Sequence, residues 1–340
     1  MTKVSIGLPV YNGEPFLRET LDAILAQTYR DFELIISDNT STDATAEICR
    51  QYALNDKRIR YYRMEENIGA SRNFNRVFQL SLGQYFKWAA HDDLIASNYL
   101  AQCVEVLNRD RSVVLCHSQV QIINERGQFL QDYNIKLNTD SVNPVTRFRE
   151  LLNQHLCYPI FGLIRASILR NTSLMGNYGH TDGVLLASIA LQGRFHEIPE
   201  PLFFSRKHSQ QSMSMFFPAY LSLASGDTSI SANKLPDYYA YAVWFDPTKK
   251  GQTIFPHWRI LREYYLAVWR ASLSLTERIN CYFSMFRQLR GLEYLLLKDL
   301  IVATSQIIHS LLSIKQTILT NFNYRKRFID YEDSNKRLSK

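Results

Sequence analysis

The chain has 340 residues, of which 46% are hydrophobic and 21% charged, and its 39 Lys and Arg against 32 Asp and Glu give a formal net charge of +7. This composition supplies a full hydrophobic core and excludes a disordered or collagen-like chain, and the length predicts one large domain plus an extension. The positive charge favours anionic partners such as nucleotides or a membrane surface.

Short β-rich runs alternate with helical patterns through the first 120 residues. In chain order the pattern predicts a strand over Val4–Val10, and then a helix with Pro15 in its first turn and apolar residues at Leu17, Leu21, Ile24 and Leu25. It next predicts a strand over Phe32–Ser37, a helix that begins at Ser41–Asp43, a strand over Ile59–Met64 and a helix over Ser71–Leu82. The series ends with a strand over Gln84–Ala89, a helix over Asn98–Asn108 and a strand over Val113–His117. Strands that alternate with helices predict an α/β fold, a Rossmann-like, mainly parallel sheet with helices on both faces.

The sequence changes character beyond about residue 215. Aromatic residues crowd 238–258, and the pattern that follows is long, helical and poor in Gly and Pro. We therefore expect two parts, an α/β domain over residues 1–215 and an aromatic-rich, mostly helical C-terminal extension over residues 216–340.

The end of this extension carries one apolar helix face. Its large apolar residues recur at spacings of three, four and seven, and they are Leu300, Ile301, Ile307, Ile308, Leu311, Leu312, Ile318, Leu319 and Phe322. This face either packs against the rest of the chain or a second subunit, or it attaches the protein to a membrane, where the basic residues 325–327 would meet anionic lipid.

Cysteine usage and the chain ends predict a cytoplasmic protein. The five cysteines are odd in number and far apart, with no C-x-x-C pair and no His at metal-ligand spacing. The N-terminus lacks the run of about 7–15 apolar residues of a signal peptide. The run 300–314 contains polar side chains and is shorter than the about 20 apolar residues of a transmembrane helix. We expect a cytoplasmic chain, at most peripheral at the inner face of the plasma membrane.

Three polar clusters follow three of the predicted strands. They occupy residues 9–13, 38–43 and 91–93, and side chains at the carboxyl ends of parallel strands lie at one edge of a sheet. The adjacent acids Asp92 and Asp93 repel each other unless a cation or a raised pKa relieves them, and Mg²⁺ or Mn²⁺ takes such carboxylates as ligands. Considered alone, the pair would cap a helix, but the joint arrangement favours a metal site.

A series of short motifs runs through residues 3–212. They are Val4–Asn12 with Leu17 and Leu21, Ile35–Asp43, Asn67–Gly69 with Arg72 and Asn73, Ala90–Asp93, Thr181–Asp182, Gly193–Phe195, Pro199–Leu202 and Arg206–His208. As a set and in this order, the motifs resemble the family 2 glycosyltransferases, which have the GT-A fold. The resemblance implies an enzyme that binds a nucleotide-sugar donor and transfers its sugar.

The resemblance also implies which residues hold the donor. Pro9, Tyr11 and Asp38 match positions that bind its base and ribose, and Arg72 suits the diphosphate region. Asp38 alone would also fit an Asx-turn. The other donor contacts that the motifs imply are Asn12, Asn67, Gly69, Asp92 and Arg206.

Asp92 and Asp93 resemble the end of the family's Asp-x-Asp-Asp element, which binds the donor and a Mn²⁺ or Mg²⁺ between its two phosphates. The usual first acid is Ala90 here, followed by His91. The resemblance implies Asp93 as a metal ligand and Asp92 as a ligand of the metal or the ribose. His208 is a third metal ligand, a group that closes over the diphosphate, or an ordinary core or surface histidine.

Asp182 resembles the family's general base, where the common Glu-Asp pair is Thr181–Asp182. A sugar hydroxyl is a poor nucleophile, so a carboxylate must take its proton as it attacks the anomeric carbon. The metal meanwhile neutralises charge on the departing nucleoside diphosphate. One displacement with one base implies inversion. The alternative is that Asp182 caps the helix predicted by the apolar run 184–191.

The sequence thus predicts a metal-dependent inverting glycosyltransferase that uses a nucleotide-sugar, most simply a UDP-sugar. Its acceptor would be a glycan or lipid-linked acceptor in cell-surface polysaccharide synthesis, and the protein would act as a monomer or a homodimer. The alternatives are a non-catalytic nucleotide-sugar-binding or assembly protein and a sugar nucleotidyltransferase, whose Gly-rich loop is not found near the N-terminus. Neither G-x-G-x-x-G nor G-x-x-x-x-G-K-[ST] occurs, and no basic module points to nucleic acid.

The aromatic residues of 238–258 line an acceptor cleft or pack in a core.

Overall fold

The computed structural model describes residues 3–153, 156–211, 238–290, 293–308 and 312. The strands are β1 Val4–Val10, β2 Phe32–Asp38, β3 Ile59–Arg63, β4 Tyr85–Trp88, β5 Leu94–Ile95, β6 Val113–Ile123, β7 Phe129–Tyr133, β8 Leu163–Arg165 and β9 Arg194–Arg206. The helices are α1 Glu14–Leu25, α2 Thr45–Asn55, α3 Ala70–Gln79, α4 Tyr99–Arg109, α5 Pro144–Leu152, α6 Ala166–Arg170, α7 Thr181–Ala190, α10 Tyr238–Phe245, α11 Pro256–Arg270 and α12 Leu275–Leu289, with 3₁₀ turns η1 Tyr158–Phe161 and η2 Pro247–Lys249. A further helix covers residues 293–308.

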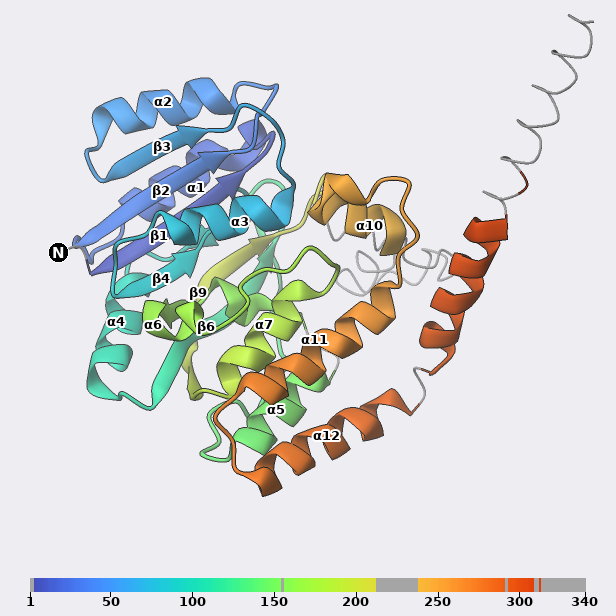
Figure 1. Ribbon diagram of the computed structural model, residues 1–340. Coiled ribbons are helices and arrows are strands. Elements are labelled where there is room, and N and C mark those ends of the chain that lie inside the picture. The colour runs from blue at the N-terminus through green and yellow to red at the C-terminus, as the bar shows by residue number, and fades with distance from the viewer. Residues whose placement is uncertain (1–2, 154–155, 212–237, 291–292, 309–311, 313–340) are drawn as a thin grey trace, which may run out of the picture.

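Within the described residues the strands form a nine-stranded sheet (Figure 1). Its main path has the order β3-β2-β1-β4-β8-β6-β9-β5, and β7 pairs with β6. The first four strands are parallel, as the alternation of strands and helices predicts, and β9 is parallel to β6. The pairs of β8 with β4 and β6, of β7 with β6 and of β5 with β9 are antiparallel. The antiparallel β6–β7 pair is joined by the 124–128 turn, which is too short for a crossover, whereas the other antiparallel pairs join strands that are far apart in sequence.

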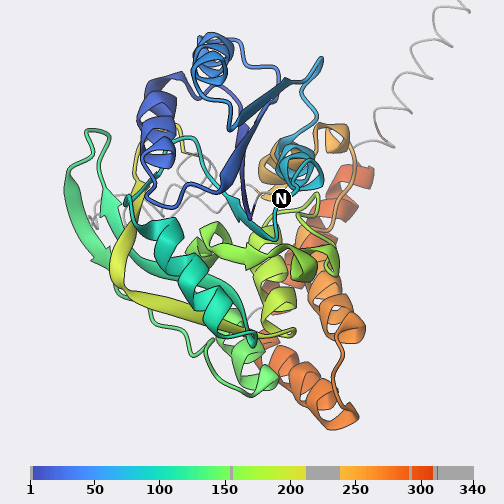
Figure 2. The ribbon, with the colours of Figure 1, turned by 90° about the vertical axis from the view of Figure 1, so that its left-hand side faces the viewer.

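The strand side chains alternate between two hydrophobic layers. Leu34 and Ile36 of β2 pack into the layer that α1, α2 and α4 complete, whereas Ile35 packs into the layer of α3, α5 and α7. This alternation follows from the period of two in a β-strand. Figure 2 shows α1 on one side of the strands and α3 on the other. The prediction of an α/β sheet with helices on both faces is confirmed.

The C-terminal helices pack on the second layer. α11 contacts α7, α12 contacts α5 and α10 contacts α3, so the extension lies beside the sheet domain (Figure 1). Asp299 of the 293–308 helix accepts hydrogen bonds from the backbone N–H groups of His257 at 2.7 Å and Trp258 at 3.3 Å, at the start of α11. These N–H groups have no partner within their own helix, so the carboxylate stabilises its first turn. No helix among the described residues has the length and apolar character needed to span a bilayer.

Some bounds differ from the prediction. β6 runs to Ile123 instead of ending at His117, because the rest of the strand pairs with β7 and β9. α2 begins at Thr45 rather than at Ser41. The Ser41 hydroxyl accepts a hydrogen bond from the Asn12 N–H at 2.9 Å, so it joins two loops instead of capping the helix. The predicted boundary at 215/216 falls outside the described residues and stays a prediction.

Gly69 brings the start of α3 into close contact with the C-terminal extension. Its φ is +83°, and a Cβ there would lie 2.5 Å from the Phe245 carbonyl oxygen and 2.7 Å from Cδ of Pro247. Its ψ is 158°, and residues other than glycine rarely adopt this combination of dihedrals. We expect Gly69→Ala to lower the free energy of unfolding by roughly 2–4 kcal/mol, about 1–3 kcal/mol of it from the backbone conformation and the rest from displacing the end of α10. Urea unfolding measures the change.

The matched control is Gly251→Ala. Gly251 has a similar φ of +78°, but a Cβ there would meet no atom within 4 Å. Only the backbone cost of a positive φ, about 1–3 kcal/mol, is expected. Equal losses in the two variants would show that the contact between Gly69 and Phe245 contributes nothing to stability.

Candidate functional site

Asp38 ends β2 inside a network of hydrogen bonds. Its side chain is fully buried. One oxygen accepts from the Ser41 N–H at 2.8 Å and the other from the Tyr61 hydroxyl at 2.9 Å, and Arg63 Nε lies 3.6 Å away. Burial and the contact with Asp38 raise the pKa of Tyr61, which therefore donates as a neutral phenol. Asp38 thus shapes the loop after β2, and its contact with a nucleotide stays a prediction.

The loop after β1 is joined to the loop after β2. Asn12 Oδ1 accepts from the Thr42 N–H at 2.8 Å, and Asn12 has a φ of +52°, a left-handed conformation that Asn tolerates. Pro9 is buried at the end of β1, whereas Tyr11 is 45% exposed. Of these predicted donor residues, Tyr11 and Asn12 are exposed and Pro9 is buried.

Asn67 and Gly69 form a turn before α3. Asn67 Oδ1 accepts hydrogen bonds from the Gly69 N–H and from the side-chain amide of Asn39, both at 2.9 Å. Arg72 is exposed on the first turn of α3. Asn67 and Gly69 therefore determine the path of the backbone, while Arg72 offers a charged side chain to solvent beside it.

The acidic pair lies in a buried turn between β4 and β5. Asp92 is 7% exposed and Asp93 8%. His208 Nε2 lies 2.9 Å from Asp92 Oδ2, and Asp93 Oδ1 accepts from the Arg206 N–H at 2.9 Å. The structure thus brings together the two predicted acids and the predicted basic residues that end β9, which are more than a hundred positions away in sequence.

The surroundings of Asp92 and Asp93 shift the pKa values of the two carboxyl groups in opposite directions. Burial raises the pKa of Asp93 to about 8, and the negative charge of Asp92 adds to the rise. Burial also opposes the ionisation of Asp92, but the positive charge of His91 and the contact with His208 outweigh it and lower its pKa. Without a metal, the pair therefore retains one proton near neutral pH.

The donor set of this turn fits a hard divalent cation that is also bound by phosphates. The buried Nδ1 of His208 has no hydrogen-bond partner in the part of the chain that the structure describes. The turn does not bring ligand atoms of Asp92, Asp93 and His208 all within 4.8 Å of one another. Among the described residues, the group that meets this distance is Cys157, His180 and Asp182. Mg²⁺ and Mn²⁺ need only one or two carboxylates when water and substrate phosphates complete the octahedron. The turn therefore suits a metal held jointly with a diphosphate.

Arg206 holds the acidic turn in place. The side chain is fully buried. Its Nε donates to the Asp92 carbonyl at 2.9 Å, Nη1 to the Glu125 carbonyl at 2.8 Å and Nη2 to Glu19 Oε2 at 2.6 Å. Because each side-chain nitrogen already has a partner, Arg206 acts here as a positioning residue for Asp92. Its predicted contact with the donor diphosphate stays a prediction.

Two buried lysines lie near the acidic pair, and the sequence analysis missed both. Lys87 in β4 is 1% exposed and Lys207 8%. Burial lowers the pKa of each to about 8, although the negative charge of Asp93 acts in the opposite direction. Lys87 also donates a hydrogen bond to the Phe161 carbonyl. The sequence signal that would have identified Lys87 is a lysine inside the otherwise apolar strand 85–88.

Asp182 lies in the first turn of α7 beside two other potential ligands. Its carboxylate oxygen, Cys157 Sγ and a ring nitrogen of His180 all lie within 4.8 Å of one another. The Asp182 carboxylate accepts a hydrogen bond at 2.9 Å from the Gly183 N–H in the first turn of α7, so the capping alternative stays open beside the predicted role as a base. The Thr181 hydroxyl accepts from the Gly176 N–H, which gives the residue at the position of the expected glutamate a structural role.

Lys207 lies near the residue that follows Cys157 in the chain. Lys207, whose pKa responds to Asp93, lies over the Tyr158 ring with its Nζ 6.0 Å from the ring centroid. Tyr158 begins η1 directly after Cys157, and Cys157 is a neighbour of Asp182. Tyr158 packs against the first hydrophobic layer and Cys157 against the second, so a single site that contains Asp182 and the acidic pair stays a prediction.

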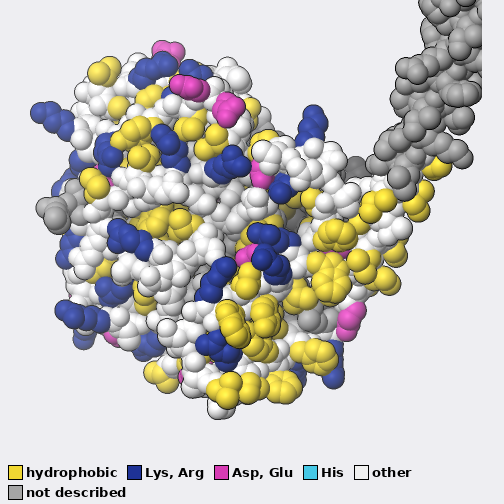
Figure 3. Space-filling model, viewed as in Figure 1, with side chains coloured by type: hydrophobic (Ala, Val, Ile, Leu, Met, Phe, Trp, Pro, Cys, Tyr) yellow, Lys and Arg dark blue, Asp and Glu magenta, His cyan; other side chains and the backbone are white. Residues whose placement is uncertain are grey.

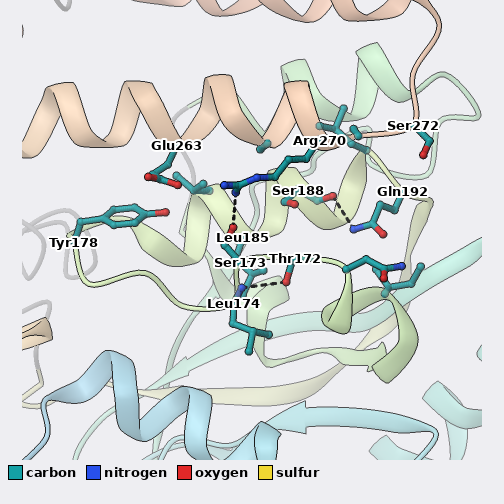
Figure 4. A pocket seen from close by; sticks show the side chains of 16 residues that line it. Thr172, Ser173, Leu174, Tyr178, Leu185, Ser188, Gln192, Glu263, Arg270 and Ser272 are labelled. Carbon is teal, nitrogen blue, oxygen red and sulfur yellow. Dashed lines mark hydrogen bonds between the residues drawn. The ribbon is translucent and has the colours of Figure 1, made fainter.

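A separate cavity of about 410 Å³ lies between α7 and α11. Figure 4 shows Arg270 extending across it to Ser173, with which it forms a 2.7 Å hydrogen bond, and Tyr178 and Glu263 lie at one end. Its size suits a small ligand. None of the predicted site residues lines this cavity, so it is distinct from the predicted donor site.

The family described as Glycosyl transferase family 2 matches residues 5–172. A Rickettsia felis protein described as an uncharacterized glycosyltransferase is 33% identical over 184 residues, which are 53% of this chain and 28% of that protein. Glycosyltransferase GlyA of Streptococcus pneumoniae is 38% identical over 98 residues, which are 29% of this chain and 14% of that protein. The chain thus spans less than a third of the length of each of these two relatives.

Solved structures share the fold. S. aureus TarS 1–349 in complex with UDP-GlcNAc superposes with a TM-score of 0.61 at 14% identity, covering 85% of this chain and 73% of that one. The same fragment without that ligand gives a TM-score of 0.60 at 13% identity, covering 85% of this chain and 72% of that one. The likeness extends well beyond residue 172, and the expected GT-A fold is confirmed.

Proposed function

We propose, on the premise that this chain belongs to glycosyltransferase family 2, that it transfers a sugar from a nucleotide-sugar to a hydroxyl group of a glycan or lipid-linked acceptor, with inversion at the anomeric carbon. A UDP-sugar is the proposed donor, since UDP-GlcNAc is the ligand named for the TarS structure of the same fold. The proposed cofactor is Mn²⁺ or Mg²⁺, and the proposed setting is cell-surface polysaccharide synthesis.

The observation that carries this proposal is the buried acidic turn, in which Asp92 lies 2.9 Å from His208. A divalent metal held by Asp93, with Asp92 or His208, would neutralise charge on the departing nucleoside diphosphate. Asp182 takes the proton of the attacking hydroxyl. Lys207 offsets part of the cost of burying the two carboxylates, because it places a positive charge near them.

A donor screen by thermal unfolding tests the proposal. The full chain is heated with UDP-, GDP- and dTDP-sugars, each with and without Mn²⁺. A ligand at 100 times its Kd stabilises the folded state by about 2.7 kcal/mol, so one nucleotide class is expected to raise the Tm, and to do so only with Mn²⁺. If no nucleotide-sugar shifts the Tm, the proposal is wrong. Donor binding without transfer or hydrolysis would favour the non-catalytic assembly protein instead.

We also propose that the C-terminal extension attaches the protein to a membrane that carries a lipid-linked acceptor. Ile301 is 61% exposed and Ile308 52%, whereas Asp299 and Ala303 of the same helix are buried. Figure 3 shows hydrophobic side chains gathered on the surface over the C-terminal helices. The remaining residues of the predicted apolar face and basic segment, Leu311, Ile318, Leu319, Phe322 and 325–327, lie outside the described residues.

Vesicle binding tests this attachment. The double variant Ile301→Glu with Ile308→Glu is expected to bind phosphatidylglycerol vesicles about tenfold more weakly, because two apolar side chains leave the interface and two negative charges enter it. Co-flotation measures the bound fraction. Leu54→Glu is the matched control, since Leu54 is 87% exposed on α2 and its change should leave binding intact. Equal binding by both variants and the wild type would favour packing against protein as the role of this face.

A further inference from the structure

Three side chains that no sequence spacing connects form a compact group at the start of α7. Cys157 Sγ, a ring nitrogen of His180 and a carboxylate oxygen of Asp182 lie within 4.8 Å of one another, and each of the three residues is partly exposed. Within the described ranges this is the one group of three such ligand atoms. Thiolate, imidazole and carboxylate are the ligands that Zn²⁺ takes in proteins, and three of them with an open fourth position form a common zinc arrangement.

The backbone of His180 has an energetically unfavourable conformation, in which its imidazole lies in this group. His180 has the left-handed dihedrals φ 62° and ψ 25°, which cost a residue with a Cβ about 1–2 kcal/mol. Gly183 provides the space for the ring, because a Cβ there would lie 2.3 Å from His180 Nε2. Such unfavourable backbone conformations are concentrated at functional sites. The conformation of His180 is therefore an observation independent of the donor atoms themselves.

Tyr264 fixes the orientation of the same imidazole. His180 Nε2 lies 2.9 Å from the Tyr264 hydroxyl, which comes from α11 and belongs to a buried residue. In the tautomer in which Nε2–H donates to this oxygen, the lone pair of Nδ1 is available for a metal. Histidines that bind metals almost always have such an outer partner on the second ring nitrogen, which fixes the tautomer and the ring orientation.

We infer that Cys157, His180 and Asp182 form a zinc-binding site, separate from the Asp92–Asp93 turn. The ligand atoms of a tetrahedral zinc ion lie about 3.4–3.6 Å apart, given Zn–S and Zn–N distances of about 2.3 and 2.0 Å. The ligand atoms lie within 4.8 Å of one another, so side-chain rotations would have to bring them to these distances around an ion. The thiolate and imidazole select Zn²⁺ over Mn²⁺ and Mg²⁺, which prefer oxygen ligands.

Zinc at this site would inhibit sugar transfer. The ion would bind the Asp182 carboxylate, which then no longer accepts the proton of the acceptor hydroxyl. This consequence rests on the proposed function, whereas zinc binding rests on the three side chains alone. The site would therefore make transfer sensitive to Zn²⁺ even when Mn²⁺ is in excess.

Co²⁺ tests the site directly, because it replaces Zn²⁺ and absorbs visible light. Co²⁺ added to the reduced full chain is expected to give the absorption of a tetrahedral ion and a thiolate-to-metal charge-transfer band, and Zn²⁺ should remove both. Cys157→Ser should abolish the charge-transfer band. Cys281→Ser should retain it, since Cys281 is a buried cysteine on α12. A wild-type spectrum without a thiolate band, or a band that persists in Cys157→Ser, would refute the site.

Two further variants distinguish this site from the acidic turn. Tyr264→Phe keeps all three ligands and removes only the outer hydrogen bond, so zinc affinity is expected to fall about 10–100-fold; unchanged affinity would contradict the assigned role of His180. Asp93→Asn is expected to leave the Co²⁺ spectrum unchanged, and its loss would assign the ion to the acidic turn. Because every readout here is metal binding, failure of the zinc site is distinguishable from failure of the glycosyltransferase proposal.

Discussion

Asp182→Asn is expected to slow sugar transfer by about 10²–10⁴-fold, because an amide cannot take the proton of the acceptor hydroxyl. Asn has nearly the shape of Asp, and the residue is partly exposed in the first turn of α7, so the fold should persist. The measurement is kcat/KM with donor and acceptor fixed. Donor affinity, measured separately in the presence of Mn²⁺, is expected to stay near the wild-type value.

The split between transfer and donor binding is the decisive part of this test. A base acts only on the acceptor side, whereas a structural residue would affect both steps. Parallel losses of donor binding and transfer would therefore remove Asp182 from the chemistry. Asp132→Asn on β7 is the control, since this exposed carboxylate lies outside the proposed site and its change should leave the transfer rate intact.

Asp93→Asn is expected to abolish Mn²⁺-stimulated transfer, with a loss of about 10³-fold or more, since a catalytic metal contributes several kcal/mol of charge stabilisation. The Asn carbonyl can still accept the hydrogen bond that the Arg206 N–H donates to Asp93, so the turn should keep its shape. Calorimetric titration with Mn²⁺ and a UDP-sugar measures the loss of metal binding. Transfer that stays equally dependent on Mn²⁺ would exclude Asp93 as a ligand.

The raised pKa of Asp93 adds a pH dependence with a definite sign. The folded protein keeps the Asp93 proton up to about pH 8, whereas the unfolded chain loses it near 3.8. The folded state therefore binds more protons between these values, and the contribution of Asp93 to stability falls as pH rises from about 4 to 8. Mn²⁺ must displace this proton, so its affinity should rise with pH and level off above 8. Mn²⁺ affinity that is constant across this range would contradict the assignment.

The sequence predicted the N-terminal half of the sheet well because its signals are local. The run Val4–Val10 is a strand with the predicted bounds, and Phe32–Ser37 lacks one residue of β2. The helical spacing of apolar residues predicted α1, and the positions of the polar clusters after the strands predicted that they lie at one edge of the sheet. The family resemblance, carried by motifs in a fixed order, is likewise confirmed for residues 5–172. The roles of the individual site residues stay predictions.

The parts that sequence reasoning missed depend on contacts between distant segments. No periodicity in the sequence relates Cys157 to His180, because their side chains meet only when η1 and α7 pack together. Arg206 was expected at the donor, but its partner Glu19 is 187 positions away, and only the folded chain shows that the guanidinium is directed beneath the acidic turn. The pairing of β8 with β4 and β6 is similarly non-local, and it makes the second half of the sheet mixed.

The separation of 187 positions between Glu19 and Arg206 also sets an order of events on the ribosome. At about 5–20 residues per second, synthesis needs about 10–40 s to cover this interval. Until Arg206 is synthesised, the nascent chain contains Asp92 and Asp93 without the side chain that holds their turn in place. Its sheet also lacks its longest strand, the 13-residue β9. A translation pause ahead of residue 206 would therefore prolong an aggregation-prone intermediate, whereas a pause after β9 leaves the tunnel would find the acidic turn already closed.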